Sequence, residues 1–168
     1  GLTNLRPLVR RPTAGGIVPH DADWTYSVTI PTTHKWYELR AIDSYYRVHE
    51  WLQRSFQSLG LSTQLAPSSI QAGPGQCFVG YEQYDLLSSG QKLAGAAQRR
   101  TSAGLLIQGS VQPPPPNIER SAWQKAMCEV GPGEDARWPC LDLDDVLRSR
   151  ATTLAHEKYS QETYNRRR

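Results

Sequence analysis

The alternation of hydrophobic and polar residues along the chain predicts several β-strands. Over residues 24–30, Trp24, Tyr26, Val28 and Ile30 alternate with Thr and Ser, the period-two pattern of a strand with one buried face. Residues 84–88 and 91–99 predict a hairpin that turns at Ser89-Gly90, and residues 104–111 supply the next strand. Two further short strands are expected over residues 5–10 and 61–66.

Helical spacing of hydrophobic residues predicts the helices. One stripe begins after a cap at Asp43 or Ser44 and ends at Gly60, a residue that often follows a helix. Its members are Tyr45, Val48, Leu52, Phe56 and Leu59. A second helix is expected near residues 121–129, and a last one over residues 142–159. Strands and helices alternate, but the hairpin favours antiparallel pairing. We therefore predict an α+β fold with a mixed, largely antiparallel sheet and packed helices.

The length and amino-acid composition limit which classes of protein fit the sequence. The 168 residues suit one domain, expected over residues 1–160, followed by a basic tail over residues 161–168. A net charge of +3 is too small to argue for nucleic-acid binding. The three cysteines lack the spacing of a zinc site, and we expect no metal site. With no long apolar run, the sequence predicts a cytoplasmic protein without a membrane partner.

The first candidate for chemistry is the segment Arg10-Arg11-Pro12-Thr13-Ala14-Gly15-Gly16, followed by His20-Asp21. Two adjacent glycines permit backbone conformations that point consecutive N–H groups at an anion or a carbonyl oxygen. Arg11 could bind a carboxylate or phosphate, and His20 could donate to a substrate. On glycine content alone, an ordinary glycine turn with exposed arginines is the commoner explanation.

The second candidate is Cys77 with Lys92, fifteen residues further along the chain. A cysteine in a flexible loop can act as a nucleophile, and a nearby ammonium can stabilise the oxyanion of an acyl-transfer reaction. Gly95 and Ala97 follow Lys92 on the predicted strand and leave room for a substrate. The alternatives are a buried structural cysteine and a surface lysine, both common in proteins.

Together these segments resemble the biotin/lipoate protein ligase catalytic domain family. The first is similar to the family's Arg-Arg-x-(Ser/Thr)-Gly-Gly…His-Asp motif. The run that begins at Lys92, Lys-Leu-Ala-Gly-Ala-Ala-Gln-x-Arg, is similar to the family's lysine-bearing strand. Within the family, Cys77-Phe78 ahead of Tyr84-Asp85-Leu86 looks most like the lipoate-ligase-type octanoyltransferases.

The resemblance implies a function and a set of site residues. The protein would transfer an octanoyl or lipoyl group from acyl carrier protein to a lysine of a lipoyl-domain protein. Cys77 would carry the acyl group, and Lys92 would bind its carbonyl. The substrate-binding residues would be Arg11, Thr13, Gly15, Gly16, His20, Gly95 and Ala97. This thioester route requires no cofactor and no metal.

Two other functions stay open. In an ATP-dependent lipoate ligase, which would use ATP and Mg, Lys92 and the glycine loop would hold an acyl-adenylate and Cys77 would be incidental. A non-catalytic lipoate-binding or scaffold domain is the third possibility. The chain departs from the family at Ala14, where glycine is usual, and at Gln108, where histidine is usual. It also begins almost at the double-arginine motif, so the N-terminal part of the family domain is expected to be missing.

Overall fold

The computed structural model describes residues 7–13, 15–70, 80–133, 138–139 and 141–166. The chain divides into two compact units. The larger one, Gly15–Trp138, holds the sheet and the helices packed on it. The smaller one combines Gly1–Ala14 with Pro139–Arg168.

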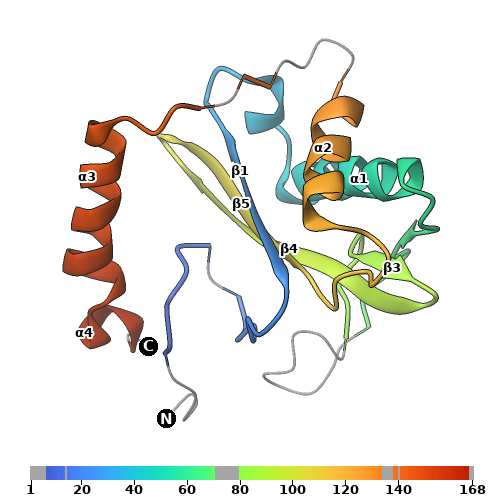
Figure 1. Ribbon diagram of the computed structural model, residues 1–168, viewed down its shortest axis with the longest axis horizontal. Helices are drawn as coiled ribbons and strands as arrows, with labels where there is room; N and C mark the ends of the chain where they lie inside the picture. The colour runs from blue at the N-terminus through green and yellow to red at the C-terminus, as the bar shows by residue number, and fades with distance from the viewer. Residues whose placement is uncertain (1–6, 14, 71–79, 134–137, 140, 167–168) are drawn as a thin grey trace. The chain divides into compact units, whose positions relative to one another are not determined.

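Five antiparallel strands form the sheet, in the order β1-β5-β4-β3-β2 (Figure 1). They are β1 (Trp24–Ile30), β2 (Gln64–Leu65), β3 (Leu86–Ser88), β4 (Gln91–Thr101) and β5 (Gly104–Val111). At the predicted hairpin turn between β3 and β4, Ser89 and Gly90 have φ values of 49° and 76°. A two-residue loop with both φ angles positive matches the twist of the flanking strands. The α+β fold and the antiparallel hairpin are therefore confirmed.

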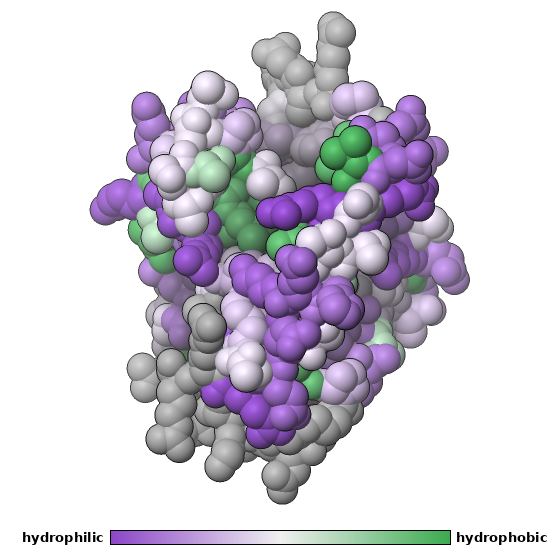
Figure 2. Space-filling view, turned by 90° about the vertical axis from the view of Figure 1, so that its left-hand side faces the viewer, coloured by the Kyte–Doolittle hydropathy of each residue, from purple (hydrophilic) through white to green (hydrophobic). Residues whose placement is uncertain are grey.

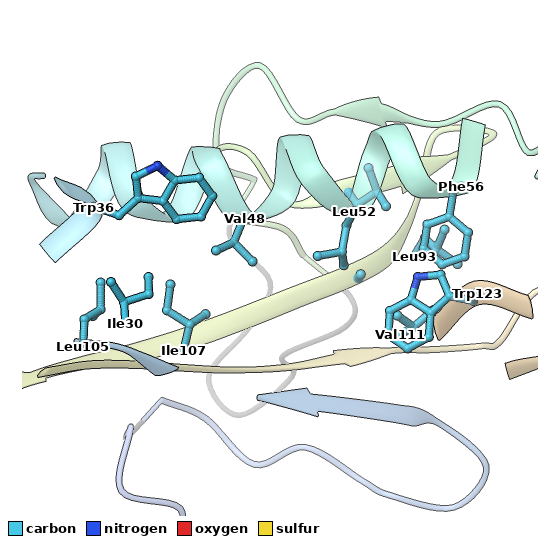
Figure 3. Packing of buried hydrophobic residues seen from close by; sticks show 12 residues of the cluster. Ile30, Trp36, Val48, Leu52, Phe56, Leu93, Leu105, Ile107, Val111 and Trp123 are labelled. Carbon is cyan, nitrogen blue, oxygen red and sulfur yellow. The ribbon is translucent and has the colours of Figure 1, made fainter. Parts of the chain in front are cut away.

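Helix α1 (Ala41–Ser58) covers one face of the sheet, and its buried side chains form part of the hydrophobic core (Figure 3). Val48, Leu52 and Phe56, members of the predicted stripe, are fully buried. They meet strand residues that include Ile107 and Val111. Burying each such side chain contributes roughly 1.5 to 3 kcal/mol, so this one stripe is a main source of stability. The helix ends before Gly60, whose φ is +81°.

The two other predicted helices follow their ranges closely, and a short further helix lies where only a basic tail was predicted. Helix α2 (Arg120–Val130) packs against α1, and its Trp123 stacks on Phe56 with ring centroids 5.9 Å apart. In the smaller unit, α3 (Asp145–Leu154) continues into a π-helical turn, Ala155–Tyr159, and α4 (Glu162–Asn165) follows. Asp144 caps α3 by accepting a hydrogen bond from the Leu147 N–H.

Several predicted elements and boundaries differ from the structure. Residues 7–10 form no strand, and the strand expected over residues 61–66 is reduced to the two residues of β2. Helix α1 begins at Ala41, earlier than the predicted cap. The cause is that Asp43 and Ser44 bond elsewhere: Asp43 pairs with Arg40, and the Ser44 hydroxyl donates to Gln98 on β4.

The surface mixes hydrophilic and hydrophobic residues. On the face shown in Figure 2, hydrophobic residues interrupt a mainly hydrophilic surface. Large hydrophobic side chains that are exposed include Leu141, Leu143 and Val146. Among the residues that the structure describes, no helix is long and apolar enough to cross a membrane.

Candidate functional site

Lys92 forms an ion pair with a carboxylate in the interior of the larger unit. Its Nζ lies 2.8 Å from Oδ2 of Asp85, and the side chains are 10% and 0% exposed. Lys92 stands near the start of β4, and Asp85 directly precedes β3, the neighbouring strand. Buried charges are rare in proteins unless they are paired, and they are concentrated at functional sites. The predicted lysine is therefore part of a buried charged centre.

Asp85 is itself held by two further donors. Its Oδ2 accepts a hydrogen bond of 2.8 Å from the Glu82 N–H, and its Oδ1 accepts one from the Tyr45 hydroxyl. The Tyr45 oxygen in turn accepts the Ala96 N–H of β4 at 3.0 Å. Burial and the negative charge of Asp85 raise the pKa of Tyr45 well above its ordinary value, so this hydroxyl keeps its proton and donates it.

Gly95 leaves the space that the ion pair occupies. A Cβ at this position would lie 2.7 Å from Lys92 Cε and 2.8 Å from its Nζ. It would also lie 2.9 Å from Oδ1 of Asp85. The sequence predicted that small residues on this strand make room for a substrate. In the structure, the room beside Gly95 is filled by the protein's own charged pair.

A second buried polar pair lies next to this one. The Tyr26 hydroxyl is 3.3 Å from Nε2 of His49, and the His49 and Tyr45 rings meet edge to face with centroids 4.2 Å apart. The Tyr26 ring crosses Gly109, where a Cβ would lie 2.1 Å from Tyr26 Cζ. Burial, followed by the charge of Asp85, raises the pKa of Tyr26. These residues extend the polar centre between α1 and the sheet.

We expect His49 to make folding sensitive to acid. Burial lowers its pKa from 6.5 to about 4, and the charges of Asp85 and Lys92 act on it in opposite directions. Between about pH 6.5 and 4, His49 therefore binds a proton in the unfolded chain but not in the folded chain. Stability falls as pH falls through this window, by roughly 3 kcal/mol in total. Urea unfolding of the wild type at several pH values between 7.5 and 4.5 measures the loss.

The matched variants for this test are His49→Phe and His156→Gln. The His49→Phe variant should lose most of this dependence on pH, whereas His156→Gln, which changes an exposed histidine, should retain it. An unchanged slope of stability against pH in His49→Phe would assign the acid loss to other groups.

His20 lies in a separate cluster at the end of β5. Its Nδ1 is 2.8 Å from Oδ2 of Asp23, which also accepts a hydrogen bond from the Ser110 hydroxyl. Burial disfavours the Asp23 carboxylate, but the bonds from Ser110 and His20 outweigh it, and the pKa of Asp23 lies below its ordinary value. The His20 side chain is 52% exposed. This cluster attaches the loop before β1 to β5.

A cavity of about 660 Å³ brings Lys92 and this loop together. Its wall includes Lys92, Asp21, Asp23, Tyr81 and Gln112. Volumes of this size are typical of sites for small molecules. Lys92 thus lines a cavity whose wall also includes the residues that follow His20.

The other predicted site residues are divided between the two units. Gly15, with φ of 97°, and Gly16 are exposed in the larger unit, whereas Arg11 and Thr13 belong to the smaller unit. Ala97 pairs with Gln108 on β5. Cys77 lies outside the described residues. Among the residues that are described, no group of three or more His, Cys, Asp or Glu side chains could hold a metal ion.

Comparison with known proteins agrees with the predicted family and fold. A model of the lipoyl protein ligase A/B catalytic domain matches residues 3–156. The octanoyltransferase LipM of Staphylococcus aureus is 33% identical over 112 residues, which cover 62% of this chain and 41% of the relative. The chain thus spans about two-fifths of the length of this relative.

Solved structures of low sequence identity share the fold. A putative lipoate protein ligase of Thermoplasma acidophilum with bound lipoic acid superposes with a TM-score of 0.69 at 21% identity. A bipartite lipoate protein ligase, described with its E2 lipoyl domain from the same organism, gives a TM-score of 0.66 at 18% identity. Both alignments cover 94% of this chain, and they cover 71% and 69% of the two solved chains. Because the family model matches residues 3–156, most of the chain, and the sheet agrees with the solved folds, the chain belongs to the lipoyl protein ligase A/B catalytic domain family.

Proposed function

We propose that this protein transfers an octanoyl or lipoyl group from acyl carrier protein to a lysine of a lipoyl-domain protein. The observation that carries the proposal is that Lys92 lines the 660 Å³ cavity and that a fully buried carboxylate holds its ammonium. The LipM relative is named an octanoyltransferase, and the Thermoplasma ligase was described with a lipoyl domain. These names support both the acyl group and the acceptor.

Two acyl exchanges make up the proposed reaction. The thiolate of Cys77 attacks the carbonyl carbon of the carrier thioester, a new C–S bond forms, and the carrier leaves as a thiol after taking up a proton. The acceptor lysine then attacks the Cys77 thioester as a neutral amine. An amide bond forms, the Cys77 C–S bond breaks, and the amine proton passes to the departing sulfur.

Lys92 would act on the charge that develops during both exchanges. Each attack turns a planar carbonyl into a tetrahedral intermediate with an oxyanion, and a fixed ammonium stabilises that oxyanion more than the starting carbonyl. An ammonium with little exposure to water does so more strongly, because less solvent screens its charge. The 10% exposure of Lys92 suits this role.

Cys77→Ser is expected to abolish transfer from octanoyl-acyl carrier protein to a lipoyl domain. Serine retains the shape of cysteine but forms a far weaker nucleophile at neutral pH. Intact-mass measurement of the wild type with the carrier substrate should show one octanoyl adduct that Cys77→Ser lacks. The matched control is Cys128→Ser, which changes an exposed free cysteine and should keep both the adduct and the activity.

The same assay separates the alternative functions. Lipoylation by Cys77→Ser with lipoate, ATP and Mg would replace the transferase by an ATP-dependent ligase. Binding of lipoate without product from either donor would indicate the non-catalytic domain. Transfer from the carrier that is independent of ATP and lost in Cys77→Ser supports the transferase.

A further inference from the structure

Three donors hold the fully buried carboxylate of Asp85. A carboxylate offers about four lone-pair positions, and Asp85 fills three of them with the ammonium of Lys92, the N–H of Glu82 and the hydroxyl of Tyr45. These donors come from β4, from the loop before β3 and from α1. Three separate parts of the fold therefore determine where one carboxylate lies.

We propose that Asp85, supported by Tyr45 and Gly95, is the positioning residue for Lys92. Asp85 holds the ammonium of this cavity-lining residue in one place, while Gly95 provides the space in which the pair lies. This inference rests on the proposed function, because it assigns the geometry of the lysine that acts on the substrate. Asp85 is fully buried and acts through Lys92.

The contact with Asp85 restricts where the Lys92 ammonium can lie. A lysine has four rotatable bonds, and an unanchored ammonium would sample positions several ångströms apart. Displacement of a catalytic group by about 1 Å can reduce the rate on the order of a hundredfold. Asp85 anchors the ammonium with one contact of 2.8 Å.

Gly95→Ala is the sharpest test, since it changes neither charge nor any hydrogen-bonding group. The new methyl group would lie 2.8 Å from Nζ of Lys92 and 2.9 Å from Oδ1 of Asp85, so the pair must move. We expect kcat for transfer from octanoyl-acyl carrier protein to fall on the order of a hundredfold, with KM changed little. Gly133→Ala is the matched control, because nothing lies within 4 Å of its Cβ position, and its kcat should stay within about twofold.

Two variants of the carboxylate's surroundings complete the series. Asp85→Asn removes the charge and should approach the activity of Lys92→Ala. Tyr45→Phe removes one donor but leaves the ion pair, and should give a smaller loss of kcat. Circular dichroism checks that each variant is folded. If Asp85→Asn does not fold, Gly95→Ala and Tyr45→Phe still decide the question.

A second measurement does not depend on activity. In 15N spectra of lysine side chains, the wild type should give a protected ammonium signal that is absent from Lys92→Ala. The signal should disappear in Asp85→Asn, shift in Gly95→Ala and stay unchanged in Gly133→Ala. An unchanged signal in both Asp85→Asn and Gly95→Ala overturns the proposal. So does full kcat in both when Lys92→Ala is inactive.

Different results would refute the role of Lys92 in acyl transfer and the positioning role of Asp85. Full transfer by Lys92→Ala would refute the role of Lys92 in the proposed function. The ammonium signal would then decide by itself whether Asp85 positions this lysine. Loss of the ammonium signal together with loss of kcat supports both proposals.

Discussion

Lys92→Met should destabilise the protein by about 3 to 5 kcal/mol, and Lys92→Met combined with Asp85→Asn should recover most of that loss. The single change leaves a carboxylate with 0% exposure without its cation, which is the costly way to break a buried ion pair. In the double variant, the introduced amide can still accept the Glu82 N–H through its oxygen and can donate to the Tyr45 oxygen through its nitrogen. The buried position then contains no charge.

Urea unfolding of the four proteins in this cycle gives the coupling free energy of the pair. We expect about 2 kcal/mol or more. The exposed pair Lys125–Glu129, with Nζ 3.6 Å from Oε1, is the matched control, and the cycle of Lys125→Met and Glu129→Gln should show almost no coupling. Purely additive effects of Lys92→Met and Asp85→Asn would contradict the buried pair.

The second large effect is expected for Gly109→Ala. A Cβ at this position would lie 2.1 Å from Cζ and 2.3 Å from the hydroxyl oxygen of Tyr26. The Tyr26 ring is confined between Gly109 and the rings of His49 and Trp123, so it has little room to move. We expect a loss of roughly 3 kcal/mol in the free energy of unfolding. Chemical denaturation of the purified variant measures it.

Removing the Tyr26 side chain tests whether its clash with the new methyl group causes the loss of stability in Gly109→Ala. Tyr26→Ala combined with Gly109→Ala should be no less stable than Tyr26→Ala alone, because the three atoms nearest to the new methyl group all belong to the Tyr26 ring and hydroxyl. Gly133→Ala, where a Cβ meets nothing within 4 Å, should change stability by less than about 0.5 kcal/mol. A Gly109→Ala variant as stable as the wild type would contradict the close contact between Tyr26 and Gly109 of β5.

Hydrophobic periodicity predicted the parts of the fold in which one face is buried. β1 and β5 match their predicted ranges, because alternation along a strand records burial directly. The start of α1 could not be predicted in this way. Asp43 and Ser44 have the side chains of a helix cap, but Asp43 pairs with Arg40, and Ser44 donates to Gln98 on β4. A contact with a strand more than fifty residues away leaves no local pattern at the helix start.

The sequence indicated a candidate site residue only where that residue stood in a recognisable motif. Lys92 stands in a recognisable motif, and the structure locates it at a cavity. Tyr45 was assigned to the hydrophobic stripe of a helix, and Asp85 was part of a motif without a role of its own. His49 follows Tyr45 by four residues, so both lie on one face of α1, and a histidine on that face was the available clue. Which of them pair depends on strand register and on the helix's docking.

The three donors on Asp85 have a consequence for the entropy of ligand binding. A lysine side chain has about 2 kcal/mol of rotamer entropy to lose when it is immobilised. In this protein the loss occurs during folding, when the ammonium meets a carboxylate that Glu82 and Tyr45 already fix. A ligand that reaches Lys92 through the cavity therefore meets a preorganised cation. Its affinity is not reduced by the ordering of that side chain.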